Sequence, residues 1–166
     1  MTIAPTLQKY LADHEVAYDL VPHPPTESSL RTAEACHIPG DRLAKGILLR
    51  DPTTYWLAVV PATRRVRIPD LKEEIGEPVD LANEGEVSEV FHDCARGAIP
   101  PVGPCYRLDV IVDESIEQQP DLYFEAGDHQ TLVHVSQSEF ARLNPHARHG
   151  RFSASPPIRN SCGLKG

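Results

Sequence analysis

The segments Lys45-Gly46-Ile47-Leu48-Leu49 and Tyr55-Trp56-Leu57-Ala58-Val59-Val60 are two apolar runs of strand length. Between them lies Asp51-Pro52-Thr53-Thr54, whose composition is typical of a turn. Two such runs joined by a short turn predict an antiparallel hairpin. Because the runs contain few polar side chains, we expect this hairpin to lie at the centre of the molecule.

On both sides of the hairpin, the expected strands and helices do not alternate regularly. Further strands are expected over residues 16–21, 108–112, 122–124 and 131–135. Helices are expected over residues 5–14, 32–37 with Thr32 as cap, and 70–75, and after two capping-box-like starts, Asn83 with Glu86 and Ser136 with Glu139. This order differs from the strict strand–helix repeat of a doubly wound parallel sheet, so the predicted class is a compact α+β domain.

The length of 166 residues suits one domain with one hydrophobic core. The predicted domain covers residues 1–143. From Asn144 onward the sequence turns to Pro, Ser, Arg, His and Gly, with few apolar positions. Such a segment buries too little surface to offset the entropy of ordering it. Residues 144–166 are therefore expected to form a flexible C-terminal tail.

Charge and hydropathy exclude several classes of function. The chain has 16 Lys and Arg against 24 Asp and Glu, a formal net charge of −8. Proteins that coat nucleic acid by nonspecific phosphate attraction need a basic surplus, so no DNA partner is expected and any RNA contact must be local. The one local surplus is Arg64-Arg65-Val66-Arg67, a pattern that solvated surfaces also show. No run approaches the roughly 20 apolar residues of a spanning helix, and the N-terminus shows no export signal, so we expect no membrane partner and a cytoplasmic location.

Disulfides and metal sites are not expected. The four cysteines, Cys36, Cys94, Cys105 and Cys162, are scattered without a C-x-x-C pair, which is typical of reduced thiols. The ligands of His92-Asp93-Cys94 diverge on a helix, and His146 and His149 have no cysteine or carboxylate nearby. We therefore predict no metal site.

Three stretches could act on a ligand, and each also has a purely structural interpretation. The Lys45 ammonium either reaches solvent along its aliphatic stem or lies in a cleft and binds an anion. Residues 97–104, Gly-Ala-Ile-Pro-Pro-Val-Gly-Pro, form either a rigid connector or a stiff loop with free N–H groups. Residues 125–129, Glu-Ala-Gly-Asp-His, form either an ordinary hairpin or a support for His129, which could orient a water or contact a ribose.

Four motifs occur in order between about residues 18 and 143: Ala44-Lys45, Ala58-Val59-Val60-Pro61-Ala62, Gly97-Ala98-Ile99-Pro100-Pro101-Val102-Gly103 and Phe124-Glu125-Ala126-Gly127-Asp128-His129. In this combination the chain resembles the YbaK-like aminoacyl-tRNA deacylase family, which includes the editing domain of bacterial prolyl-tRNA synthetases. The resemblance implies a mixed, barrel-like β-sheet flanked by helices. It also implies hydrolysis of the ester between a mischarged amino acid and the terminal adenosine of tRNA, without a cofactor.

The resemblance further implies which residues form the site. Lys45 and His129 are the expected catalytic residues, and the expected substrate-binding residues are Gly46, Gly97, Ala98, Ile99, Pro101, Val102, Gly103, Gly127 and Asp128. In our hypothesis, Lys45 anchors the phosphate or ribose of the terminal adenosine, loop amides hold the ester carbonyl, and His129 helps to place substrate or water.

The expected partners are the acceptor end of a mischarged tRNA and, with it, an aminoacyl-tRNA synthetase or an elongation factor. Members of the family that edit alanine or cysteine on proline tRNA often have a polar residue after the lysine, whereas this chain has Gly46. The edited amino acid therefore stays open. The alternative function is a non-catalytic module of the same fold that binds a tRNA end or a nucleotide.

Overall fold

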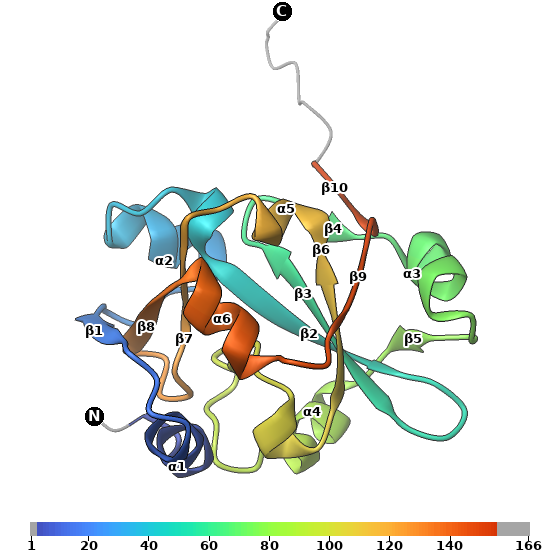
Figure 1. Ribbon diagram of the computed structural model, residues 1–166, viewed down its shortest axis with the longest axis horizontal. Helices are drawn as coiled ribbons and strands as arrows, with labels where there is room; N and C mark the ends of the chain where they lie inside the picture. Colours follow the sequence, from blue (N-terminus) through green and yellow to red (C-terminus); the bar gives the residue numbers. More distant parts are fainter. Residues whose placement is uncertain (1–2, 156–166) are drawn as a thin grey trace, which may run out of the picture.

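Strands β2 (Ala44–Arg50) and β3 (Tyr55–Pro61) form the predicted antiparallel hairpin, with Ala44 opposite Pro61 and Arg50 opposite Tyr55. The computed structural model describes residues 3–155. In the turn of the hairpin, Asp51 Oδ1 accepts hydrogen bonds from the backbone N–H groups of Thr53 and Thr54. The hairpin lies at the centre of a five-stranded sheet with the order β5-β2-β3-β6-β9, as Figure 1 shows. The prediction of a central hairpin is confirmed.

The described strands are arranged in three sheets. In the largest, β3 pairs in parallel with β6 (Asp109–Asp113), β6 pairs in parallel with β9 (Arg148–Gly150), and β5 (Asp80–Leu81) pairs antiparallel with β2. A second, antiparallel sheet has the order β1-β8-β7, formed by Asp19–Pro22, Thr131–Ser136 and Asp121–Glu125. A third pairs β4 (Arg65–Val66) with β10 (Ser153–Ala154).

The predicted α+β class, with mixed β-sheet flanked by helices, is confirmed. A parallel bridge between Leu43 and Tyr123 joins the start of β2 to β7 and thereby connects the two larger sheets. Among residues 3–155 none of the sheets closes on itself, so the barrel-like character is limited to this junction.

Capping residues and other local sequence features predict where several of the helices begin. The α-helices are α1 (Pro5–Asp13), α2 (Ser29–Ala35), α3 (Ile68–Ile75), α4 (Glu84–Val90), α5 (Glu114–Glu117) and α6 (Gln137–Leu143). The capping box of α4 is present, since Asn83 Oδ1 accepts from the Glu86 N–H and Glu86 Oε1 accepts from the Asn83 N–H. The prediction of Thr32 as a cap is wrong: α2 begins earlier, capped by Ser28, and Thr32 lies buried inside the helix. No helix of residues 3–155 has the length and apolar character that crossing a bilayer requires.

The central sheet separates two hydrophobic clusters because side chains alternate between its faces. Leu48 and Leu57 face the larger cluster, which includes residues of α1 and α6, whereas Leu49 faces the smaller cluster with Leu71 of α3. In Figure 1, α1, α4 and α6 accordingly lie on one side of β2, and α3 lies on the other. Alternate residues at the start of β2 therefore belong to different sides of the molecule.

The predicted start of the flexible tail at Asn144 is wrong, because ordered structure continues beyond it. Strands β9 and β10 both follow Asn144, and the side chain of Phe152 between them is fully buried in the smaller cluster. The Phe152 N–H donates to Asp113 Oδ1 at 3.0 Å. Composition could not predict that this segment is ordered. Two short strands that pair with β6 and β4, together with one buried aromatic side chain, are enough to hold a polar segment in place. The rest of the expected tail, residues 156–166, lies outside the described residues.

Replacing Phe152 by alanine tests whether this segment belongs to the folded domain. We expect Phe152→Ala to lower the free energy of unfolding by about 3–5 kcal/mol, since the change leaves a cavity in the smaller cluster. Urea denaturation followed by circular dichroism measures this loss. Leu20→Ala is the matched control, because Leu20 is 51% exposed and should cost less than about 1 kcal/mol. Equal losses in the two variants would contradict the assignment.

Candidate functional site

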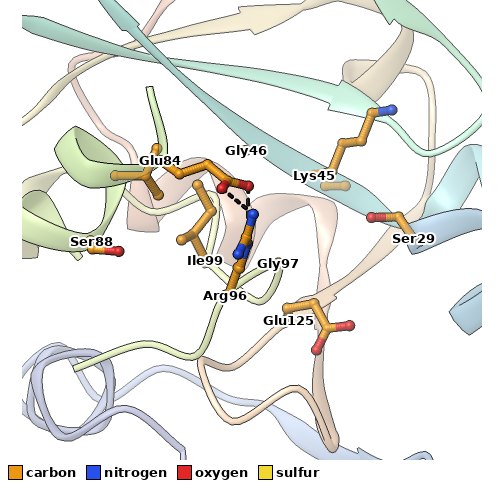
Figure 2. A pocket seen from close by; sticks show the side chains of 11 residues that line it. Ser29, Lys45, Gly46, Glu84, Ser88, Arg96, Gly97, Ile99 and Glu125 are labelled. Carbon is orange, nitrogen blue, oxygen red and sulfur yellow. Dashed lines mark hydrogen bonds and ion pairs between the residues drawn. The ribbon is translucent and has the colours of Figure 1, made fainter. Parts of the chain in front are cut away.

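A cavity of about 230 Å³ opens between the start of β2, helix α4 and the loop that follows α4. Its walls come from segments far apart in the chain, and Figure 2 shows their side chains around one space. The lining residues are Ser29, Ala44, Lys45, Gly46, Glu84, Val87, Ser88, Arg96, Gly97, Ile99 and Glu125. Four predicted site residues therefore meet here: Lys45, Gly46, Gly97 and Ile99. The cavity is the candidate functional site.

Lys45 borders the cavity, but its ammonium points out of it. Figure 2 shows the amine end turned away from Glu125 and from the Glu84–Arg96 pair. Burial, together with the charge of Arg65, lowers the pKa of Lys45 below its usual value. No ion pair joins Lys45 to another residue of 3–155, so its charge is available to an anion from outside.

Gly46 allows the loop 97–103 to approach β2. A Cβ at this position would lie 3.0 Å from Leu57 Cδ1 and 3.4 Å from Pro101 Cα. A side chain at position 46 would thus crowd the side chain of Leu57, and its Cβ would already be in van der Waals contact with the loop backbone. The absence of a side chain keeps this wall of the cavity close and apolar.

Two hydrogen bonds from the side chain of Asn144, a residue expected to lie in the tail, hold the loop 97–103. Asn144 is buried; its Oδ1 accepts from the Gly103 N–H and its Nδ2 donates to the Pro101 carbonyl, both at 3.0 Å. The Ala98 N–H donates to the Ala95 carbonyl at 3.1 Å. Two N–H groups of the loop, those of Ala98 and Gly103, are therefore already hydrogen-bonded within the protein. Ala98, Pro101, Val102 and Gly103 are buried and do not line the cavity.

His129 lies behind the cavity wall rather than in it. Its Nε2 lies 2.8 Å from the Thr26 carbonyl, which can only accept, so Nε2 carries the proton of this bond. Its Nδ1 is buried without a hydrogen-bond partner, and the ring lies against Gly97, where a Cβ would be 3.4 Å from His129 Cε1. His129 thus supports Gly97, and its backbone has a positive φ of 59°.

Gly127 and Asp128 shape the hairpin that carries His129. Gly127 has φ +102°, and a Cβ there would lie 2.6 Å from Ala4 Cβ, so only glycine fits against the start of α1. Asp128 Oδ1 accepts from the Gln130 N–H, and Oδ2 accepts from Thr131 Oγ1. Neither residue lines the cavity, and both carboxylate oxygens of Asp128 are used within the turn.

The structure adds a buried pair to the site, His23 with Glu125. His23 Nε2 lies 3.1 Å from Glu125 Oε1, and both side chains are almost fully buried. His23 Nδ1 lies 2.7 Å from the Pro24 carbonyl, which fixes a proton on Nδ1. The pair then shares one further proton, held either by the carboxyl group or by Nε2. Because 102 residues separate the partners, local sequence gave no signal for this pair.

The described cysteines are free thiols, and two of them are strongly shielded from solvent. Burial raises the pKa of Cys94 and of Cys105 to about 12, which keeps these thiols protonated at neutral pH. Cys36 is also a free thiol, and Cys162 lies outside the described residues. Within residues 3–155 no group of three His, Cys, Asp or Glu side chains could hold a metal ion.

The two hydrogen bonds between Asn144 and the loop 97–103 predict that Asn144→Ala strongly lowers the stability of the protein. Removing the amide leaves the Gly103 N–H and the Pro101 carbonyl buried without partners, so we expect the free energy of unfolding to fall by about 2 kcal/mol or more. Hydrogen exchange of the Gly103 amide should be slow in the original protein and fast in the variant. Slow exchange of the Gly103 amide in Asn144→Ala would show that Asn144 does not hold the loop.

The buried carboxyl of Glu125 predicts a pH-dependent effect on stability. Burial raises the pKa of Glu125, although His23 opposes the shift. Folding therefore favours the protonated form, and the stability it contributes is lost as pH rises from about 4.3, the pKa of an unfolded glutamate, through the folded pKa. In urea denaturation between pH 4 and 8, Glu125→Gln should gain stability relative to the original protein as pH rises, and then level off. A relative loss would mean that His23 dominates.

Residues 23–143 match the aminoacyl-tRNA editing domain family. No curated protein matches the chain significantly. A solved structure described as a "putative trans-editing enzyme for prolyl tRNA synthetase" aligns with a TM-score of 0.80 at 21% identity, over 93% of this chain and 100% of that chain. The hypothetical protein APE2540 aligns with a TM-score of 0.79 at 22% identity, over 90% and 99%. At these identities the structures show a shared fold alone. The family match, however, spans most of the sequence, and the chain belongs to the aminoacyl-tRNA editing domain family.

Proposed function

We propose that the protein is a deacylase that hydrolyses the ester of mischarged aminoacyl-tRNA and so releases the wrong amino acid. The observation that carries the proposal is the cavity, where Lys45 and Gly46 of β2 meet Gly97 and Ile99 of the loop. Membership of the editing domain family supports the same reaction. An editing site of this kind improves fidelity, because a synthetase pocket rejects a smaller side chain by only ~1–3 kcal/mol per methylene.

The reaction needs no covalent intermediate on the protein. A water oxygen attacks the ester carbonyl carbon and gives a tetrahedral oxyanion, and the bond to the ribose oxygen then breaks. The water proton passes to the leaving ribose oxygen, through a neighbouring ribose hydroxyl or a second water. Because an aminoacyl ester is already activated, positioning and stabilisation of the oxyanion supply most of the acceleration.

Loop amides are the proposed donors to the oxyanion. The N–H groups of Gly97 and Ile99 are the best candidates, since both residues line the cavity and their N–H groups have no acceptor among the described residues. Preformed donors of this type contribute ~3 kcal/mol each. In this proposal, His129 acts as a positioning residue that supports Gly97 from behind.

Lys45 is the proposed anchor for the acceptor end of tRNA. Its ammonium points away from the cavity, and the positive charge of Arg65 acts on it, which suits a phosphate group better than the reacting carbonyl. A chain of net charge −8 has little general attraction for RNA, so the contact is local. We therefore propose that the protein reads mainly the acceptor end and meets it in the cytoplasm, together with a synthetase or an elongation factor.

A panel of mischarged tRNAs tests the proposed function. Purified protein is incubated with tRNAs that carry alanine, serine, cysteine or other amino acids, and the release of labelled amino acid is followed over time. An enzyme releases the amino acid over many turnovers. A binding module of the same fold, the alternative function, slows spontaneous hydrolysis at equimolar protein and gives no turnover, and that result would overturn the proposal.

Replacing Lys45 by alanine tests the anchor. We expect Lys45→Ala to lower kcat/KM at least about 100-fold, mainly through KM, because a charged contact with phosphate is lost. Lys72→Ala is the matched control, since Lys72 is an exposed lysine of α3 away from the cavity and should leave kcat/KM unchanged. Both variants should keep the circular dichroism spectrum of the original protein. Unchanged turnover in Lys45→Ala would remove the anchor from the proposed mechanism.

A further inference from the structure

Glu125 is a buried carboxylate in the wall of the cavity, at the end of β7. One oxygen, Oε1, lies 3.1 Å from His23 Nε2. The other, Oε2, has no hydrogen-bond partner among the described residues. It is nevertheless not enclosed by protein, because His129 Nδ1 is the only fully buried side-chain nitrogen or oxygen of residues 3–155 that lacks a hydrogen-bond partner. Oε2 therefore remains accessible from the cavity and can accept a hydrogen bond from a ligand.

The charge of Glu125 has no permanent cation beside it. The other carboxylate of the cavity, Glu84, is paired with Arg96 at the exposed rim, and Figure 2 shows this pair away from Glu125. No lysine or arginine of residues 3–155 forms an ion pair with Glu125. The shared proton of the His23 pair can move to Nε2, which leaves the carboxylate ionised and still hydrogen-bonded. A cationic donor bound at Oε2 favours this ionised form.

An aminoacyl ester brings such a cation. Its α-ammonium is attached to the carbon next to the ester carbonyl, so a carbonyl held near Gly97 and Ile99 carries the ammonium into the same cavity. We propose that Glu125 binds the α-ammonium group of the substrate, so that the site accepts esters with a free amine and rejects esters whose amine is acylated. This inference rests on the proposed function and adds a specificity-determining residue to it.

The selection separates two classes of ester that share the same tRNA end. Mischarged aminoacyl-tRNA has a free amine, whereas peptidyl-tRNA and formylated initiator tRNA carry an amide in its place. An amide has lost the charge and two of the three donors of the ammonium, and its acyl group needs extra space beside a buried carboxylate. Glu125 would thus protect growing peptides from hydrolysis in a cavity that otherwise fits any small side chain.

The test compares free and N-acetylated ligands in three proteins. The first ligands are alanyl-, seryl- and cysteinyl-tRNA with their N-acetyl derivatives, and each rate is divided by the spontaneous rate of the same ester. The second ligands are the amide analogue 3′-alanylamino-3′-deoxyadenosine and its N-acetyl form, whose binding is followed by NMR titration. The proteins are the original chain, Glu125→Gln, and the charge-matched control Glu89→Gln, in which an exposed carboxylate of α4 outside the cavity is removed.

We expect the original protein and Glu89→Gln to prefer the free amine by at least about tenfold, and Glu125→Gln to lose most of this preference. Glutamine keeps the size of the side chain and can still donate to His23, so the variant should remain folded; its melting temperature checks this. Equal binding of the two analogues by the original protein, or a full preference in Glu125→Gln, would overturn the inference. Amine-dependent binding without turnover of any ester would support it and overturn the deacylase proposal.

Discussion

The contact between the loop 97–103 and strand β2 at Gly46 is the constraint on which the site depends. A Cβ at Gly46 would already touch the loop backbone at Pro101, and Asn144 holds the same loop through hydrogen bonds to Pro101 and Gly103. The central hairpin supplies a rigid surface, because β2 and β3 are paired along seven residues each. The cavity therefore has one wall of sheet and one wall of clamped loop, and neither can move without breaking buried hydrogen bonds.

A positive and a negative side chain lie at different depths of this cavity. The Lys45 ammonium lies outside, near Arg65, whereas the Glu125 carboxylate lies inside, paired with His23. Burial raises the pKa of Glu125, which means that the folded protein holds this group at a cost in stability near neutral pH. A structural core would lose nothing by replacing such a pair with apolar side chains, so its presence in the cavity wall favours a functional interpretation.

Sequence could predict the parts of the fold that depend on neighbours along the chain. The central hairpin, the capping box at Asn83 and the helix capped by Ser136 all follow from patterns within a few residues, and all are present. The cap at Thr32 failed because Ser28 begins the helix one turn earlier. The expected tail failed because its order comes from pairing with β6 and from the burial of Phe152, neither of which composition records. For the site, the motifs indicated Lys45 and the loop, whereas the contributions of Asn144 and of His23 with Glu125 depend on contacts across 41 to 102 residues.

The polarity of the site matches that of an aminoacylated tRNA end under the proposed function. The nucleic acid is anionic along its backbone, and the amino acid at its tip carries the only positive group nearby. With Lys45 at the opening of the cavity and Glu125 in its wall, this substrate would be oriented with its ester between the two charges, beside the amides of Gly97 and Ile99. Each charge alone would attract either a phosphate or an amine; the two together favour a ligand that carries both in this order. This arrangement explains how an acidic protein could select an RNA end without a broad basic surface.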